Sequence, residues 1–187
     1  MEKEKLWGGN TEIEEDGFRV EKADEGDYQV FAHIIQKAWA AMDQKEWFVA
    51  DNADYTYRML TTGKGMGYKA VDPAADVVAG VFMAVIPGLD ENNMGYDVGL
   101  PAEELSLVAH MDSVAVLPKY RGHRLQRRLM TAAEKELRER GFRYLMCTVH
   151  PDNLYSRNNV AAQGYESMMM KEKYGGYPRE IFLKKLF

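Results

Sequence analysis

Apolar residues recur at two different spacings along the chain, and each spacing predicts one kind of element. A spacing of two, or a short continuous apolar run, predicts strands. These predicted strands cover residues 18–23, 67–71, 77–86, 105–117, 144–149, 165–171 and 179–186. The second and third are joined across Asp72-Pro73, which predicts a hairpin.

A spacing of three and four residues predicts helices between these strands. The first follows Asp24 and Asp27, either of which can cap its amides. Its apolar face comprises Phe31, Ile34, Ile35, Ala38 and Met42. Further helices are predicted over residues 53–60 and 122–140, and from Asp152 or Asn153 to Gly164. The order of elements predicts an α/β fold, in which a mixed central sheet carries helices on both faces.

Length and composition favour a single domain over residues 1–187, with residues 1–17 as a loosely tied leader. The chain is 46% hydrophobic and 28% charged, as expected of a globular protein with one sizeable core. No apolar run is long enough to span a bilayer, and the first ten residues lack the apolar stretch of a secretory signal. The single cysteine, Cys147, excludes an internal disulfide framework and suits a cytoplasmic location.

The segment from Met111 to Met130 carries the clearest chemical signal. An apolar strand runs through a Pro-led turn into a helix, and the turn is basic although the chain has a net charge of −5. Its cations are Lys119, Arg121, Arg124, Arg127 and Arg128. The first amides of a helix lack backbone acceptors, and the helix dipole favours negative charge there. This pattern predicts a phosphate-bearing ligand on the turn.

The same segment resembles the GNAT superfamily of acyl-CoA-dependent N-acyltransferases. Members carry Arg/Gln-x-x-Gly-x-Gly/Ala after a Val-rich strand and a Pro. Here Arg121 fills the first position, while Arg124 and Gln126 stand where the two glycines belong. The resemblance continues to the C-terminus and implies a GNAT fold that binds acetyl-CoA as acyl donor. It assigns coenzyme A contacts to Val114, Ala115, Val116, Arg121, Gly122, His123, Arg124, Leu125, Gln126, Arg127, Asn153 and Ser156.

His110 and Asp112 are the candidate catalytic residues. They lie two apart on the predicted central strand, so their side chains share a face, opposite to Met111 and Ser113. A histidine pKa of about 6.5 suits proton transfer, so His110 is a candidate general base that Asp112 orients. A purely structural hydrogen-bonded pair fits the pattern equally well. Within the resemblance, GNAT histone acetyltransferases place a catalytic Glu at the position of His110, and arylalkylamine N-acetyltransferases place histidines at both positions.

The expected general acid is missing. Many family members protonate the leaving thiolate with a Tyr at a position that Val160 occupies here, which leaves Tyr155 and Ser156 as weak candidates. A thiol with a pKa of about 8.5 can also leave as the thiolate. Asn153 has two open interpretations, a contact to the coenzyme A arm or a helix cap.

Other polar side chains point to structure rather than chemistry. Cys147 lies in an apolar run and is interpreted as core. His150 has two open interpretations, a structural residue at a strand end, which is favoured, or a lining residue of the acceptor site. No Cys or His pair has the spacing of a zinc site, so no metal is predicted.

These patterns lead to a functional hypothesis. The chain is predicted to be a cytoplasmic N-acetyltransferase that passes an acetyl group from acetyl-CoA directly to a small-molecule or peptide amine in a ternary complex. The alternative is a coenzyme A-binding module with little or no catalysis. The acidic net charge argues against a nucleic-acid partner, no membrane partner is expected, and a homodimer is possible.

Overall fold

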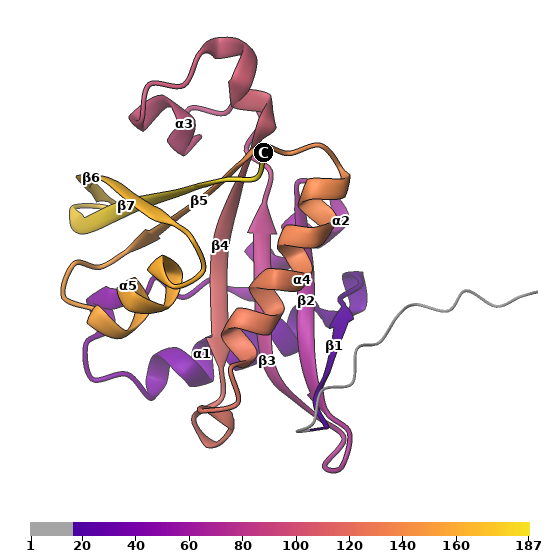
Figure 1. Cartoon of the computed structure of the whole chain (residues 1–187). Coiled ribbons are helices and arrows are strands. Elements are labelled where there is room, and N and C mark those ends of the chain that lie inside the picture. The colour runs from indigo at the N-terminus through magenta and orange to yellow at the C-terminus, as the bar shows by residue number, and fades with distance from the viewer. Residues whose placement is uncertain (1–16) are drawn as a thin grey trace, which may run out of the picture.

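Seven strands form one sheet in the order β1-β2-β3-β4-β5-β7-β6 (Figure 1). The structure is a computed structural model that describes residues 17–187, so nearly all of the predicted leader lies outside the described residues. The strands are β1 (Arg19–Lys22), β2 (Gly65–Asp72), β3 (Val77–Val85), β4 (Val108–Val116), β5 (Tyr144–Val149), β6 (Glu166–Lys173) and β7 (Tyr177–Lys185). The α-helices are α1 (Tyr28–Ala40), α2 (Ala53–Thr61), α3 (Met94–Asp97), α4 (Leu125–Glu139) and α5 (Leu154–Ala161). Four 3-10 turns are η1 (Glu25–Asp27), η2 (Lys45–Trp47), η3 (Ala102–Leu107) and η4 (Pro118–Tyr120).

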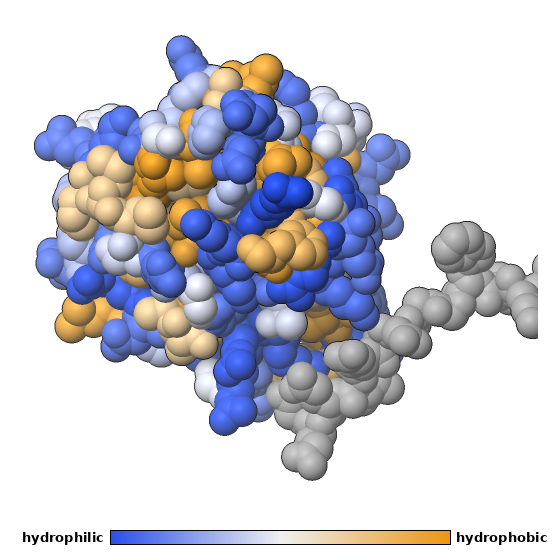
Figure 2. Space-filling model, turned by 45° about the horizontal axis from the view of Figure 1, so that its top comes forward, coloured by the Kyte–Doolittle hydropathy of each residue, from blue (hydrophilic) through white to orange (hydrophobic). Residues whose placement is uncertain are grey.

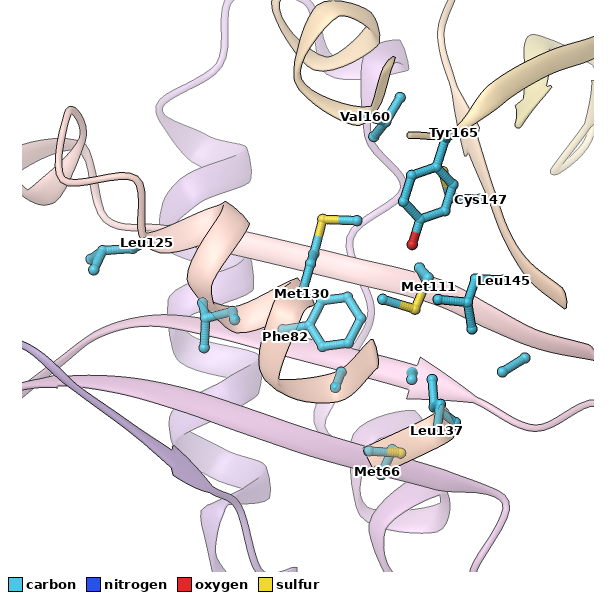
Figure 3. Close-up of a cluster of buried hydrophobic side chains, with 14 of the residues drawn as sticks. Met66, Phe82, Met111, Leu125, Met130, Leu137, Leu145, Cys147, Val160 and Tyr165 are labelled. Atoms are coloured by element: carbon cyan, nitrogen blue, oxygen red, sulfur yellow. The ribbon is translucent and has the colours of Figure 1, made fainter. Parts of the chain in front are cut away.

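Helices cover both faces of the sheet, which confirms the predicted α/β class. α4 crosses one face and α1 lies against the other (Figure 1). α4 buries Leu125, Leu129, Ala133 and Leu137 in the larger core cluster, part of which Figure 3 shows. Burial of these side chains removes apolar area from water and fixes α4 on the sheet.

The face of α1 agrees with the sequence prediction except at its end. Phe31, Ile34, Ile35 and Ala38 are buried against β3 and β4. Met42 lies beyond the last residue of α1 and outside that core cluster. Asp24 caps η1, not α1 itself, through a reciprocal capping box with Asp27.

The middle of the sheet is split. β4 pairs with β3 in antiparallel fashion along most of its length, but its parallel pairing with β5 covers only Val108, Ala109 and His110. Beyond His110, β5 continues to pair with β7 while β4 continues beside β3. The two central strands therefore diverge and leave part of each edge unpaired with the other.

Two predicted elements begin three residues later than the sequence suggests. The strand predicted from residue 105 begins at Val108, because residues 102–107 form η3. The helix predicted from Gly122 begins at Leu125. Between β3 and β4, for which no helix was predicted, the chain also forms the single-turn helix α3.

The surface of the described chain is mixed. Hydrophobic residues lie in patches separated by hydrophilic ones on the face shown in Figure 2. Within residues 17–187, no helix has the length and apolar character needed to cross a membrane.

Candidate active site

A groove of about 870 Å³ opens where β4 leaves β5. Its lining comes from the end of β4, the end of α1 with the segment that follows it, the basic turn with the start of α4, and α5 with its cap. Its lining residues are Ala38, Ala41, Met42, Asp43, Gln44, Trp47, Phe48, Val114, Ala115, Val116, Tyr120, Arg121, Gly122, Arg124, Leu125, Gln126, Arg127, Asn153, Tyr155, Ser156 and Asn159. We call it the β4 groove. Its volume is that of a pocket for an organic ligand of substantial size.

The predicted coenzyme A residues gather in this groove with one exception. Eleven of the twelve line it, although Asn153 and Ser156 come from the cap and first turn of α5 and the rest from β4, the basic turn and the start of α4. The exception is His123, whose ring packs on Phe18 with centroids 5.0 Å apart. The fold thus brings together residues that are separate in the sequence.

The basic turn has an unusual backbone. Gly122 has φ 92°, and Arg124 has φ 56° and ψ 20°, so both are left-handed. Arg124 is the residue before α4, and left-handed backbone there favours glycine, the residue that the family motif has at this position. Arg124 therefore holds a left-handed backbone that its own side chain disfavours. The prediction that Arg124 lies within the helix, with right-handed helical backbone, is wrong.

Asn153 combines its two predicted interpretations. Its side-chain oxygen accepts a hydrogen bond from Ser156 N at 3.0 Å and so caps α5. The same residue lines the β4 groove.

His110 is covered by α3. It is buried, and its Nε2 accepts a hydrogen bond from Met94 N at 3.1 Å. Burial lowers the pKa of His110 to about 4, and the positive charge of Lys173 adds to this effect. The nitrogen that would accept a proton is thus engaged with backbone.

A β-bulge changes the faces of β4 next to His110. Met83 of β3 is opposite Ser113, but Ala84 is opposite Met111, so Asp112 is the extra residue. The strict alternation expected from the sequence fails here. Ser113 was predicted on the face opposite Asp112, yet its hydroxyl lies 3.4 Å from Asp112 Oδ2.

The bulge brings Asp112 and Ser113 together with side chains from two distant segments. Tyr55 OH donates to Asp112 Oδ2 at 3.2 Å, and Ser113 Oγ donates to Asp51 Oδ2. Tyr174, from the turn between β6 and β7, has its hydroxyl 3.1 Å from Thr148 Oγ1 of β5, and burial together with the charges of Asp112 and Asp51 raises its pKa. Asp51, Tyr55, Asp112, Ser113 and Tyr174 are called the carboxylate cluster below. The cluster lies on β4 immediately before the groove-lining residues.

Both acids of this cluster hold protons more tightly than usual. Asp112 is exposed as a residue, but its carboxylate is desolvated by the groups around it, and with repulsion from Asp51 this raises its pKa to about 7. Burial also raises the pKa of Asp51, against the opposing hydrogen bond from Ser113. Burial and the nearby Asp112 raise the pKa of Tyr55, so Tyr55 stays protonated as a donor. A carboxylate that titrates near neutral pH is suited to general-base catalysis.

Sequence reasoning missed Asp51, Tyr55 and Tyr174 as site residues. No motif surrounds them, and their separation from Asp112 exceeds 50 residues on either side. The only available signal was a weak one, the clustering of Tyr174, Gly175 and Gly176 in a turn, where all three have positive φ.

The remaining candidates have structural surroundings. Val160 is buried in the larger core cluster beside Tyr165 (Figure 3). Burial raises the pKa of the Cys147 thiol to about 12, so the thiolate nucleophile is disfavoured. His150 is buried, stacks on Trp47 and accepts a hydrogen bond from Asp152 N. Within residues 17–187, no three His, Cys, Asp or Glu side chains are grouped to hold a metal.

Comparison with solved structures confirms the fold. NAA60 from Arabidopsis thaliana in complex with acetyl-CoA has a TM-score of 0.72 at 11% identity, over 90% of this chain and 98% of that one. The ribosomal-protein-S18-alanine N-acetyltransferase from Escherichia coli has a TM-score of 0.67 at 15% identity, over 90% and 94%. A putative acetyltransferase, yncA, from Salmonella typhimurium with acetyl-CoA has a TM-score of 0.67 at 16% identity, over 91% and 94%.

Sequence comparison agrees with the structural likeness. No curated protein matches the chain. The family model described as "Acetyltransferase (GNAT) family" matches residues 32–165, which include β4, the basic turn and α5. The chain belongs to the GNAT family of acetyltransferases.

Proposed function

We propose that the protein is an N-acetyltransferase that passes the acetyl group of acetyl-CoA directly to an amine in a ternary complex. The observation that carries the proposal is the continuity of the β4 groove with the carboxylate cluster. Val114 lines the groove, and Asp112, two residues earlier on the same strand, carries a carboxylate whose pKa is raised to about 7. A donor site and a proton acceptor are thus adjacent.

Acetyl-CoA binding is supported by the chemistry of the groove. Arg121, Arg124 and Arg127 supply cations at the turn, where the N-terminus of α4 also favours phosphate. Val114 and Val116 supply an apolar strand edge with backbone groups that β5 does not pair. Two of the solved relatives above carry acetyl-CoA in their structures.

We assign the proton-accepting role to Asp112 in place of His110. An alkylamine with a pKa of about 10 is almost wholly protonated at pH 7 and must lose a proton before it attacks. Asp112 takes that proton; the nitrogen then bonds to the acetyl carbon, the C–S bond breaks, and its electron pair stays on sulfur. A second proton from the nitrogen neutralises the thiolate, and Asp112 returns its proton to solvent. His110 lacks a free Nε2 for this step.

No tyrosine at the family position supplies a proton to the leaving sulfur, because Val160 is buried there. Tyr155 and Ser156 line the groove and keep their place as candidate proton donors. A thiol of pKa about 8.5 is a tolerable thiolate leaving group without either. Catalysis then rests mainly on positioning two substrates and on Asp112.

A thermal scan and a thiol-release assay test this proposal. Acetyl-CoA at about 100 times its Kd should stabilise the protein by about 2.7 kcal/mol and raise the melting temperature by about 5 °C or more. Arg121→Ala should lower that shift at the same concentration. An amine panel should then identify acceptors by release of free thiol. A scan with no shift at millimolar acetyl-CoA would sink the proposal.

A coenzyme A-binding module without catalysis is the second candidate. Val160 and the replacement of both motif glycines by Arg124 and Gln126 favour it. It predicts the thermal shift but no thiol release with any amine.

A further inference from the structure

Asp51 is a second carboxylate beside the proposed base, and the fold holds it there from both sides. Gln36 of α1 donates its side-chain amide to Asp51 O at 3.2 Å. The next residue, Asn52, caps α2 by accepting from Tyr55 N at 2.9 Å. The backbone of Asp51 is therefore fixed between two helices, and its side chain is directed to β4.

Ser113 links the two acids. Ser113 Oγ donates its proton to Asp51 Oδ2. Asp112 Oδ2 lies 3.4 Å from Ser113 Oγ. The two carboxylate oxygens are thus within roughly 6 Å of each other, since both are near hydrogen-bond reach of one atom. A hydroxyl has a single proton, so Ser113 satisfies Asp51 and leaves most of the repulsion between the acids in place.

The surroundings of this pair supply little positive charge. Tyr55 faces Asp112 from α2, Tyr174 faces it from the turn between β6 and β7, and β4 itself contributes the neutral His110. Within residues 17–187, neither Asp51 nor Asp112 forms an ion pair with Lys or Arg. Arg179 is buried, and its guanidinium lies over the Tyr174 ring, 5.5 Å from the ring centroid.

We infer that Asp51 is a positioning residue for acetyl transfer, which acts through Asp112 and selects acceptors that arrive as ammonium cations. The inference rests on the proposed function. An isolated Asp, with a pKa of about 3.9, is a poor base for an ammonium group. A second negative charge close by makes Asp112 a stronger base, and an ammonium group that enters between the acids relieves their repulsion. An arylamine, neutral at pH 7, gains nothing from the pair.

The first test is the pH profile of kcat/KM with the best aliphatic amine found in the panel. Asp51→Asn keeps the shape and an acceptor for Ser113 but removes the charge, so the acid limb of the profile should move down by about one pH unit or more. KM for the aliphatic amine should rise, while KM for aniline should not. Asp51→Glu restores the charge and should keep the limb within about half a unit of the wild type.

Asp54→Asn is the matched control. Asp54 is exposed in the first turn of α2, three residues from Asp51, and the substitution makes the same change in net charge. It should leave the limb in place. An acid limb that stays fixed in Asp51→Asn, or that moves equally in Asp54→Asn, overturns the inference.

The second test needs no turnover. The carboxyl carbons of 13C-labelled aspartates can be titrated by NMR in the wild type and in Asp51→Asn, with the Asp112 signal identified by its loss in Asp112→Asn. The midpoint of Asp112 should fall by about one unit or more when Asp51 is neutralised. An unchanged midpoint overturns the role of Asp51 even if acetyl transfer is real. A shifted midpoint with no thiol release from any amine would instead refute the proposed function and leave the coupling standing.

Discussion

The β4 groove and the carboxylate cluster share one strand but are assembled in opposite ways. Most groove residues are close neighbours in the sequence, from Val114 to Arg127, and the arginines among them give the groove a positive charge. The cluster collects Asp112 from β4, Asp51 from before α2 and Tyr174 from a turn near the C-terminus, and it carries negative charge. This contrast matches the proposed ligands, a polyphosphate donor and a cationic acceptor. In the proposed function, it also places acetyl-CoA binding and proton transfer at different positions along β4.

The largest effect is expected from Asp112→Asn, which tests whether the groove and the carboxylate cluster have separate roles. If the cluster carries the proton transfer, kcat should fall by about a hundredfold or more, the usual effect of losing a general base. The thermal shift by acetyl-CoA should be unchanged, because Asp112 does not line the groove. Residual activity should rise with pH as more of the amine loses its proton in solution. In the wild type, kcat/KM should fall below an apparent pKa near 7, as the raised pKa of Asp112 implies.

Thiol release at saturating acetyl-CoA, from pH 6 to 9, measures kcat and kcat/KM for the amine, and a thermal scan measures the shift by acetyl-CoA. Near wild-type turnover of Asp112→Asn over this range would break the comparison, because the base would then lie outside the cluster. Loss of the acetyl-CoA shift would break it differently, by joining Asp112 to the groove.

His110 offers the next test, since it lies two residues from Asp112 but is covered by α3. Its folded pKa, about 4, is below its usual value of 6.5, so the folded state binds this proton less tightly. The contribution of neutral His110 to the free energy of unfolding is fully present above pH 6.5. It is lost as the pH falls towards 4, because the unfolded state binds the proton first. His110→Gln keeps an acceptor for Met94 N but does not titrate. Relative to this variant, the wild type should therefore lose about 2 kcal/mol between pH 7.5 and pH 5.

Urea unfolding at the two pH values gives this difference. His33→Gln is the control, because His33 is exposed on α1. Turnover of His110→Gln at pH 7.5 should stay within a few-fold of the wild type. A hundredfold loss of turnover without loss of stability would return the base to His110, the residue that the sequence favours.

The fold follows from local pattern, and so does the grouping of most groove residues. Eleven of the twelve residues predicted to contact coenzyme A line the groove, and nine of these come from the neighbouring strand, turn and helix start; the contacts themselves stay a prediction. The proposed proton-transfer site was harder to predict because it depends on tertiary structure. Strand alternation could not reveal the bulge at Asp112, and no local signal tells that α3 covers His110 while Asp51 approaches Asp112.

The smallest effect is expected within the groove, at the left-handed Arg124. A side chain in this conformation costs roughly 1–2 kcal/mol, and glycine avoids that cost but loses more entropy on folding. Arg124→Gly should therefore stabilise the protein by about 0.5–1 kcal/mol, with a rise of about 1–4 °C in melting temperature. Arg124→Ala removes the same charge and keeps the strain, so the difference in melting temperature between the two variants isolates the backbone effect.

Acetyl-CoA affinity of Arg124→Gly, measured by calorimetry, should stay within a few-fold of the wild type, because the amide geometry is retained and only one of several cations is lost. Equal melting temperatures for the two variants would contradict the left-handed turn. A gain in affinity well beyond tenfold would mean that Arg124 obstructs the groove, which would favour the alternative of a coenzyme A-binding module with little or no catalysis.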